Sequence, residues 1–375
     1  MKPKKRLVII HIQPIELYPP IQNLLLVLNK SKSFNNITVI STCQNKLPEF
    51  SLNSKVIRIF RLNVASNTRF LRFLKYLFCV LYAILKLIQL RPKKVLYFES
   101  ISAMPAIFYK SLFQSVELFV HYHEYTTPQE YFEGMKFIKY SNKIERNTYS
   151  KFVWISHTNS VRIKLFLSDN RNVSSNIIYC LPNYPSNKWC EPIKPVAVKV
   201  DFIPNILRFV YIGALSLDDT YIAEIINFVR NSPDKYDLEL FSFHISEEIQ
   251  QLINIDEPLN IRYSGVANYN DIPSILSEKQ VGLILYKGNT LNYVYNAPNK
   301  LFEYLVCGLD VWFPKEMVGC FEYATDKNPK VVKIDFDHIE ESIKNYSYSL
   351  GNRNNDGVYY TAEAATRELI AKLVN

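Results

Sequence analysis

Residues 296–311 read NAPNKLFEYLVCGLDV, and this stretch says more about the fold than any other. Pro298 suits the first turn of a helix, because the N–H that proline lacks would have no partner there. Gly308 suits the C-terminal cap, where a left-handed backbone is easiest without a side chain. The stretch therefore predicts a short capped helix, Pro298–Cys307, that leads into a strand, Asp310–Phe313.

Polar side chains gather near the start of this helix. Lys300, Glu303 and Tyr304 are three and four residues apart, so they share a face. A helix N-terminus attracts phosphate, and Lys300 adds a positive charge. The carboxylate of Glu303 can accept two hydrogen bonds from a vicinal diol such as ribose. The pattern fits two interpretations, a grip for a nucleoside diphosphate or an ordinary surface Lys–Glu pair.

On both sides of this segment, short β-rich runs alternate with helical patterns, which is typical of parallel-sheet α/β construction. The expected strands are 7–12, 37–41, 56–61, 94–98, 118–121, 152–155, 207–212, 238–243, 260–263, 281–285, 310–313 and 331–334. The expected helices are 21–29, 68–90, 104–113, 160–167, 221–230, 298–307 and 361–374. The fold class is therefore α/β.

The chain divides near a proline-rich stretch. Residues 181–205 hold five prolines with little periodicity, which marks a linker. We expect one Rossmann-like domain over 1–185, a linker over 186–206, a second Rossmann-like domain over 207–355 and a closing helix over 356–375. Two such domains imply a cleft between two sheets, with ligands bound outside the carboxyl ends of the strands.

Charge and composition restrict the classes of protein to which the chain can belong. Residues 1–190 carry 27 Lys and Arg against 9 Asp and Glu, a net +18, whereas residues 191–375 carry 17 against 26, a net −9. The chain has 9 glycines, the first of them Gly134, so no glycine-rich dinucleotide or P-loop motif lies near the start. The six cysteines have no C-x-x-C pair, which fits a reducing cytosol.

The basic N-terminus, MKPKKRLVIIHI, is apolar only as far as His11 and lacks a cleavage site, so it indicates a first strand and no signal peptide. No window holds 18 uncharged apolar residues, so we expect no membrane span.

Four segments, taken in order, resemble GT-B glycosyltransferases, in particular the large retaining family 4. Residues 296–311 resemble the P-x-K-x-x-E-Y-L-x-x-G-x-P-V signature, and LRFVYIGAL at 207–215 resembles the first strand and glycine turn of the donor domain. IYCLPNY at 178–184 resembles the turn that ends the acceptor domain, and FVHYHEY at 119–125 resembles the Y-D-x-H-E segment of a subgroup. The resemblance implies an N-terminal acceptor domain and a C-terminal domain for a nucleotide sugar.

Site residues carried over from this resemblance are expectations. It implies that Glu303 binds the ribose, that Lys300 faces the diphosphate and that Tyr304 belongs to the same site. The backbone of Gly213 and Ala214 would approach the diphosphate, and Asn296 and Asn299 would lie near the sugar or the phosphates. His123 would be the catalytic histidine that faces the reacting sugar. No metal and no cofactor is expected.

The sequence departs from the family pattern at several positions. Tyr295 stands where an acidic residue is common, and His121 replaces the usual aspartate. Ala214 and Asp218–Asp219 stand where the family has phosphate-binding cations. Lys287 is a candidate substitute. These departures predict either a rearranged diphosphate site or weak activity, and we favour the rearranged site.

His121, His123 and Glu124 also permit a different reading, because the two histidines of H-x-H-E share a face of a strand. They could form a metal cluster, although no third ligand is evident. They could equally be strand-end histidines bonded to backbone.

The stretch 68–90 has the strongest amphipathic pattern. Its apolar stripe runs from Phe70 through Leu77 to Ile88, beside a basic flank of Arg69, Arg72, Lys75 and Lys86. The stripe is expected to pack on the sheet. The alternative is that the basic flank, with its neighbouring aromatics, touches an anionic membrane and a membrane-bound acceptor.

These features lead us to expect a cytoplasmic glycosyltransferase, peripheral on the inner face of the plasma membrane. It would move a sugar from a nucleotide-diphosphate sugar to a saccharide or polyprenyl-linked saccharide in surface polysaccharide synthesis. The alternatives are a GT-B-fold sugar-nucleotide epimerase and a degenerate scaffold without activity. No nucleic-acid partner is expected, because no RRM, KH or zinc-finger pattern is present.

Overall fold

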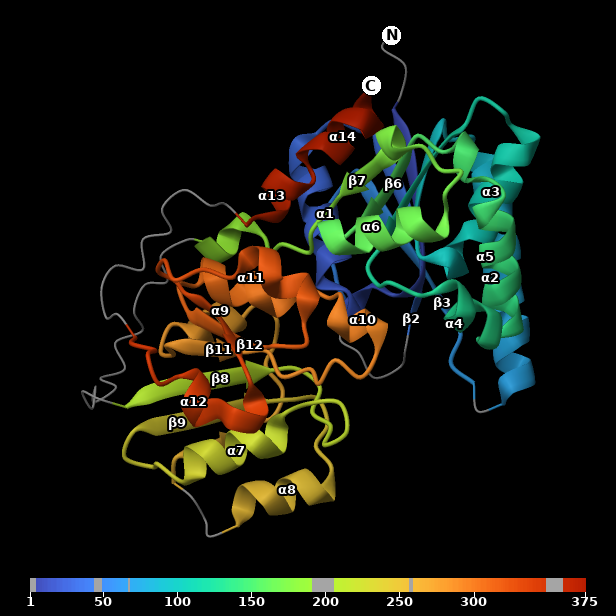
Figure 1. Ribbon diagram of the computed structural model, residues 1–375. Helices are drawn as coiled ribbons and strands as arrows, with labels where there is room; N and C mark the ends of the chain where they lie inside the picture. The colour runs from blue at the N-terminus through green and yellow to red at the C-terminus, as the bar shows by residue number, and fades with distance from the viewer. Residues whose placement is uncertain (1–4, 44–48, 67, 191–205, 256–258, 349–359) are drawn as a thin grey trace. The chain divides into compact units, whose positions relative to one another are not determined.

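The computed structural model describes residues 5–43, 49–66, 68–190, 206–255, 259–348 and 360–375 (Figure 1). The chain forms two compact units. Unit 1 comprises Met1–Asn183 and Ala362–Asn375, and unit 2 comprises Tyr184–Thr361. Most of the expected linker lies outside the described residues.

Unit 1 is built on a seven-stranded parallel sheet with the order β3-β2-β1-β4-β5-β6-β7. The strands are β1 (Arg6–Pro14), β2 (Asn36–Cys43), β3 (Ile57–Asn63), β4 (Lys94–Phe98), β5 (Glu117–Tyr122), β6 (Trp154–His157) and β7 (Ile178–Cys180). Sequence analysis missed β7, which is only three residues long. The order reverses between β1 and β4, so their carboxyl ends form the switch point of this sheet.

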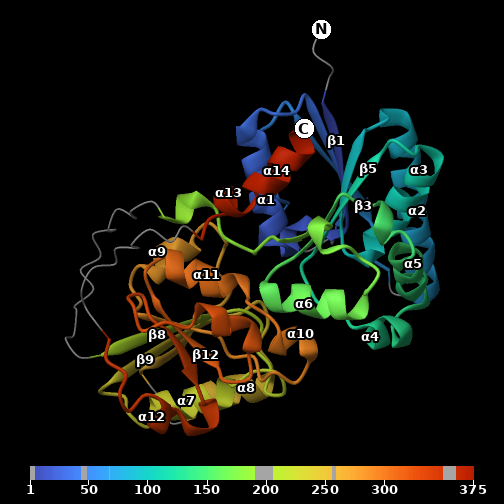
Figure 2. The same cartoon turned by 45° about the horizontal axis from the view of Figure 1, so that its top comes forward.

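Helices cover both faces of this sheet (Figures 1 and 2). They are α1 (Pro19–Ser31), α2 (Arg69–Leu90), α3 (Ala103–Leu112), α4 (Pro128–Glu133), α5 (Lys136–Arg146), α6 (Ser160–Asp169), α13 (Ala362–Ala365) and α14 (Arg367–Val374). Along β1, Val8 and Ile10 belong to the core under α2 and α3, while Leu7 and Ile9 belong to the core with α1 and α14. Burial on both faces explains why the strands read as continuous apolar runs.

The closing segment differs from the expected single helix. It forms two helices, α13 and α14, which are separated at Thr366. Leu369 and Leu373 of α14 are buried in the core of unit 1. The chain thus returns to unit 1 after completing unit 2.

The expectation for α2 is wrong about which face packs. The face that joins the core of unit 1 contains Val80, Ala83 and Leu87. The expected core stripe instead faces outward, with Phe70 72% exposed and Leu81 52% exposed. The face with Val80, Ala83 and Leu87, and not the expected stripe, therefore holds α2 against the core of unit 1.

Helix α2 is also the segment to compare with the expectation that the chain has no membrane-spanning helix. Phe70–Leu90 has the length and the mean hydropathy, 1.8, of a helix that could cross a membrane, by length and composition alone. Its inner face nevertheless belongs to the core of unit 1.

Unit 2 has a six-stranded parallel sheet with the order β10-β9-β8-β11-β12-β13. The strands are β8 (Leu207–Ile212), β9 (Tyr236–Phe241), β10 (Ile261–Tyr263), β11 (Val281–Leu283), β12 (Asp310–Pro314) and β13 (Val331–Ile334). The helices are α7 (Ile222–Arg230), α8 (Glu247–Asn254), α9 (Ile272–Leu276), α10 (Leu291–Val294), α11 (Asn299–Val306) and α12 (Ile339–Ser342). The order reverses between β8 and β11, and the two-sheet α/β fold class is confirmed.

Helix α11 begins and ends close to the predicted positions. Pro298 is its N-cap and so lies just before the first turn. Gly308 follows the last turn with a left-handed φ of 78°. The Gly308 N–H donates to the Leu305 carbonyl at 2.9 Å, and the Leu309 N–H donates to the Tyr304 carbonyl at 3.0 Å. These bonds satisfy the last carbonyls of the helix, so β12 can start at Asp310.

Candidate functional site

Lys300 is buried at the switch point of the unit 2 sheet. Its side chain reaches from α11 to the turn after β8, and it is 8% exposed. The Nζ atom lies over the ring of Tyr211 at 4.4 Å and over the ring of Tyr286 at 4.9 Å. Aromatic faces attract a cation in this geometry. Among the described residues, Nζ has no hydrogen bond of normal geometry and no ion pair.

The charge of Lys300 persists despite this burial. Burial lowers the pKa of Lys300, but Tyr211 and Tyr286 outweigh it, and the pKa lies above its usual value. A buried ammonium is costly unless an anion pairs with it. The ammonium of Lys300 is therefore suited to pair with an anionic ligand.

Gly213 makes room for that ammonium. A Cβ at position 213 would collide with Lys300 Nζ. The Gly213 N–H donates to the Phe241 carbonyl at 2.9 Å, and the Tyr211 hydroxyl donates to the Ala214 carbonyl at 2.6 Å. These two bonds shape the turn after β8, which brings Gly213 beside Lys300. The approach of Gly213 and Ala214 to a diphosphate stays a prediction.

Tyr304 supports this arrangement from the same helix. Its hydroxyl accepts a hydrogen bond from the Ile212 N–H at 3.2 Å. Its ring lies against Gly282 of β11, where any side chain would strike it. Tyr304 therefore ties α11 to β8 and β11, and this contact fixes the helix position from which Lys300 extends.

Glu303 is buried one turn along the helix, at 9% exposure. Burial raises the pKa of Glu303 to about 7, while Lys300 and a hydrogen bond from Tyr269 act in the opposite direction. No ion pair joins Glu303 to Lys300 within the described part of the chain. The interpretation of a surface Lys–Glu pair is therefore wrong, because both groups are buried and neither neutralises the other.

The remaining residues expected in unit 2 lie around this centre. Asn299 is the first residue of α11 and is partly exposed. The Asn296 carbonyl accepts a weak hydrogen bond from Cys320 Sγ at 3.4 Å. Lys287, the suggested substitute cation, is paired with Glu224 at 3.2 Å and donates to the Leu217 carbonyl at 2.9 Å. Its contacts thus hold the loop after β8.

His123 lies just beyond β5 in unit 1 and is 6% exposed. Its ring stacks on Phe98, with centroids 5.1 Å apart and planes at 13°. Burial holds the pKa of His123 well below its usual value, so the imidazole is neutral. Neither ring nitrogen has a hydrogen bond of normal geometry in the described residues. The reading of a histidine bonded to backbone is therefore wrong.

Sequence reasoning missed Glu99, which positions His123. Glu99 Oε1 accepts hydrogen bonds from the His123 N–H at 2.6 Å and the Glu124 N–H at 3.3 Å. Its backbone has a φ of 60°, which is strained for a residue with a side chain. Burial, followed by the nearby Glu124, raises the pKa of Glu99 to about 8. Only the strand order brings Glu99, at the end of β4, beside the end of β5.

His121 and His123, the candidate metal ligands, lie together with ring centroids 4.7 Å apart. His121 Nδ1 is 2.9 Å from Ser156 Oγ and so belongs to the interior of the sheet. Within the described ranges, no three His, Cys, Asp or Glu side chains form a group that could hold a metal ion.

The basic side chains of α2 that the structure describes donate hydrogen bonds to residues close to them in the sequence. Arg72 donates to the Ser66 carbonyl at 3.0 Å, Lys75 donates to the Ala65 carbonyl, and Lys86 donates to Gln89 Oε1 at 3.2 Å. The side chain of Arg69 lies outside the described residues.

These features define the class of the fold. Two parallel sheets, each with its switch point at the carboxyl ends of the strands, are the architecture of the GT-B fold. No protein-family model matches the sequence, and no curated protein matches it either.

Solved structures resemble the chain over its whole length. HepE from Anabaena, in complex with UDP and glucose, is 9% identical with a TM-score of 0.63, over 99% of this chain and 96% of that one. Sucrose-phosphate synthase from Thermosynechococcus elongatus is 12% identical with a TM-score of 0.65, over 99% and 95%. UDP-GlcNAc 2-epimerase from Methanocaldococcus jannaschii is 12% identical with a TM-score of 0.57, over 98% and 99%. At these identities the likeness shows the fold alone.

Proposed function

We propose that the chain is a glycosyltransferase that takes its sugar from a nucleotide-diphosphate sugar bound to unit 2. The observation that carries the proposal is the buried ammonium of Lys300, which lies at the switch point of the sheet and has no anionic partner in the part of the chain that the structure describes. The diphosphate would neutralise Lys300, and Glu303 would accept hydrogen bonds from the ribose. Fixed positive charge of this kind stabilises a departing diphosphate without a metal.

The acceptor half of the reaction belongs to unit 1 in this proposal. A neutral His123 can donate one hydrogen bond and accept another, which suits a hydroxyl group of the transferred sugar. We propose retention at the anomeric carbon and membership of family 4 from the sequence resemblance, and a saccharide or polyprenyl-linked saccharide as the acceptor. Surface polysaccharides such as capsule or lipopolysaccharide are the proposed products.

The outward face of α2 supports a peripheral position on the inner face of the plasma membrane. Its exposed apolar residues include Phe70, Leu77 and Leu81, next to the positive charges of Arg72 and Lys75. Such a face, in a half of the chain with a net charge of +18, is complementary to an anionic bilayer.

Titration calorimetry with UDP and GDP tests the donor site. Wild type should bind one of them, and Lys300→Met and Glu303→Ala should each bind at least about tenfold more weakly, whereas Lys235→Ala, an exposed cation of unit 2, should bind as wild type does. Equal affinity in all four proteins would contradict the proposal. Absence of any nucleotide binding would favour the scaffold.

A sugar-nucleotide epimerase is the second candidate, because one structure with this fold is that of a UDP-GlcNAc 2-epimerase. An epimerase converts its nucleotide sugar without an acceptor. Incubation with UDP- and GDP-sugars alone, followed by NMR of the sugar, distinguishes the two. A change of configuration in the intact nucleotide sugar would identify the epimerase, whereas slow release of nucleoside diphosphate would support the transferase.

A further inference from the structure

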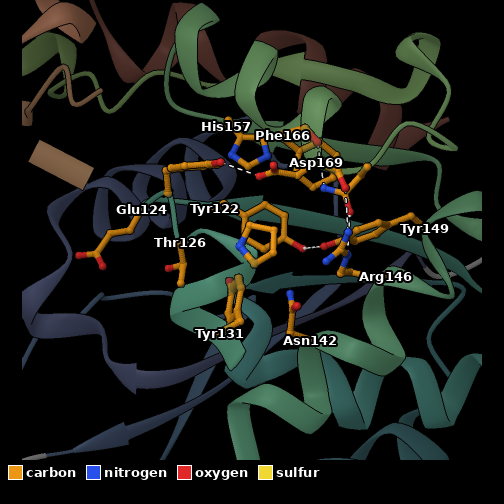
Figure 3. A pocket seen from close by; sticks show the side chains of 13 residues that line it. Tyr122, Glu124, Thr126, Tyr131, Asn142, Arg146, Tyr149, His157, Phe166 and Asp169 are labelled. Atoms are coloured by element: carbon orange, nitrogen blue, oxygen red, sulfur yellow. Dashed lines mark hydrogen bonds between the residues drawn. The ribbon is translucent and has the colours of Figure 1, made fainter. Parts of the chain in front are cut away.

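Two adjoining hollows lie in unit 1 beyond the carboxyl ends of β5 and β6. The inner chamber has a volume of about 30 Å³, and the outer groove between α4 and α5 has a volume of about 370 Å³. Pro128, Tyr131, Asn142 and Arg146 line both hollows, so the two lie side by side. Figure 3 shows the inner chamber with His157 on one side and Tyr131 and Asn142 on another.

His157 is the polar group at the inner end of this site. It is 2% exposed, and its ring stacks on Tyr122 with centroids 4.9 Å apart. Neither ring nitrogen has a hydrogen-bond partner among the described residues. The imidazole is neutral at physiological pH, so it offers one donor and one acceptor to the chamber. A sugar hydroxyl group can donate to or accept from one of these two nitrogens, and a single hydroxyl fits the small volume.

The outer groove has a different character. Lys139, Lys143 and Arg146 line it, and no acidic residue is among the described residues that do. Arg146 is held in place, because its Nε donates to Asn170 Oδ1 at 3.0 Å and a terminal nitrogen donates to the Asp169 carbonyl at 2.7 Å. Three cations around one groove favour an anionic group, and arginine and lysine are the usual partners of phosphate.

Helix α5 presents these cations from a rigid base. Its buried residues are the polar Ser141, Asn142 and Glu145, and beside them Phe137, Ile138 and Ile144 pack partly on the core. Asn142 Nδ2 donates to Ser100 Oγ at 3.2 Å, and the Tyr97 hydroxyl donates to Glu145 Oε1 at 2.6 Å. These hydrogen bonds fix α5 to the end of β4. The helix that carries the three cations is therefore held in place.

We propose that this site binds a phosphorylated saccharide. The phosphate lies against Lys139, Lys143 and Arg146, and one sugar hydroxyl enters the chamber at His157. That this ligand is the glycosyl acceptor rests on the proposed function, whereas the binding itself does not. The phosphate could belong to a soluble sugar phosphate or to a lipid-linked saccharide, since both present the same chemistry.

Titration calorimetry on the full chain with hexose 1-phosphates, the matching free hexoses and inorganic phosphate tests the proposal. At least one hexose phosphate should bind tenfold or more tightly than both its free hexose and inorganic phosphate. The double variant Lys139→Ala/Lys143→Ala should lose most of that affinity. The control Lys55→Ala/Lys93→Ala removes the same charge from exposed positions elsewhere on unit 1 and should bind as wild type does.

His157→Phe tests the chamber. The ring nitrogens of His157 have no partner to lose, so this variant should fold and melt at or above the temperature of wild type. It should keep its affinity for inorganic phosphate and lose its preference for the hexose phosphate. Vesicles with and without polyprenyl phosphate-linked sugar identify the source, because binding to those vesicles but not to soluble sugar phosphates would assign a lipid-linked ligand.

Three results would overturn the inference: no binding of any phosphorylated probe, equal affinity in the Lys139→Ala/Lys143→Ala variant, or equal affinity for hexose phosphate and inorganic phosphate. Nucleotide binding at Lys300 is measured separately in the same proteins. If no nucleoside diphosphate binds while hexose phosphate binding is intact, the proposed function is refuted and this inference is not.

Discussion

The ammonium of Lys300 occupies the space that a side chain at position 213 would need. Gly213 ends the first strand of unit 2 and Lys300 comes from a helix 87 residues later, so the sheet order alone brings them together. The absence of a side chain at one position thus permits a buried charge at the other.

Gly213→Ala should weaken nucleoside diphosphate binding about tenfold or more without unfolding unit 2. The obstructed atom is the end of a flexible side chain, so Lys300 moves aside and a charge-assisted hydrogen bond worth about 1.5–3 kcal/mol is lost. Calorimetry with UDP and GDP measures the effect. In a Lys300→Met background the same glycine change should cost little more, and additive losses would argue against this coupling.

The affinity for a nucleotide sugar should rise with pH and level off above about pH 7. The pKa of Glu303 is about 7, and only the ionised carboxylate accepts two hydrogen bonds from ribose. Below that pH the affinity should fall by up to about tenfold per pH unit. A nucleotide sugar is the appropriate probe, because its bridging diphosphate does not titrate near neutrality. Glu303→Gln should give a flat profile, and a slope that persists in this variant would assign the titration to another group.

Unit 1 should unfold in mild acid before unit 2. Burial lowers the pKa of His11 to about 4, that of His121 and His157 to about 3, and that of His123 well below its usual value. The unfolded chain therefore binds more protons at these sites below about pH 6.5, and stability is lost as the pH falls from there toward 3.

Two buried carboxyl groups oppose this loss in part. The pKa values of Glu99 and Glu145 are raised, so each contributes stability that is complete below about pH 4.5 and is lost as the pH rises. Four histidines outweigh two carboxyls below pH 6.5, so thermal melts of unit 1 should be highest near that pH. A melting temperature that is constant from pH 6.5 to 4.5 would contradict this account.

Leu87→Ala and Leu81→Ala should differ in their effect on stability although they lie on the same helix. Leu87 is fully buried, and its truncation should cost about 2–5 kcal/mol in the free energy of unfolding. Leu81 is 52% exposed, and its truncation should cost less than about 0.5 kcal/mol. Denaturant melts measure both, and equal costs would place the expected stripe in the core after all.

Leu77→Gln/Leu81→Gln should reduce cosedimentation with anionic vesicles while leaving the fold intact. Both side chains are exposed on α2 and would contribute apolar contact with the bilayer. Vesicles of neutral lipid are the control, since the basic half of the chain should prefer anionic ones. Unchanged cosedimentation would assign membrane binding, if any, to another surface.

The sequence was sufficient to predict most strands because both faces of each sheet are buried, which produces continuous apolar runs. It also located α11, whose boundaries depend on Pro298 and Gly308. Lys300 and Glu303 were identified there, but their role in nucleotide-sugar binding stays a prediction. The partners of Lys300 could not be found in this way, because Tyr211 of β8 and Tyr286, which follows β11, are distant in sequence.

Helix α5 shows why other parts of the fold escaped prediction. Its fully buried residues are the polar Ser141, Asn142 and Glu145, and its apolar residues pack only partly on the core, so the apolar pattern is weak. For α2 the error was the reverse, since the larger apolar residues face outward and small ones such as Ala83 face the sheet. In both helices, contacts with the neighbouring elements decide which side packs, and the apolar pattern of the sequence does not show them.

The position of helix α14 affects the order in which the two units can fold during synthesis. Leu369 and Leu373 complete the core of unit 1, yet they leave the ribosome after every residue of unit 2. The half that is translated first therefore cannot reach its final packing until the later half has emerged. Nascent unit 1 should depend on chaperone protection for longer than unit 2, even though its synthesis begins earlier.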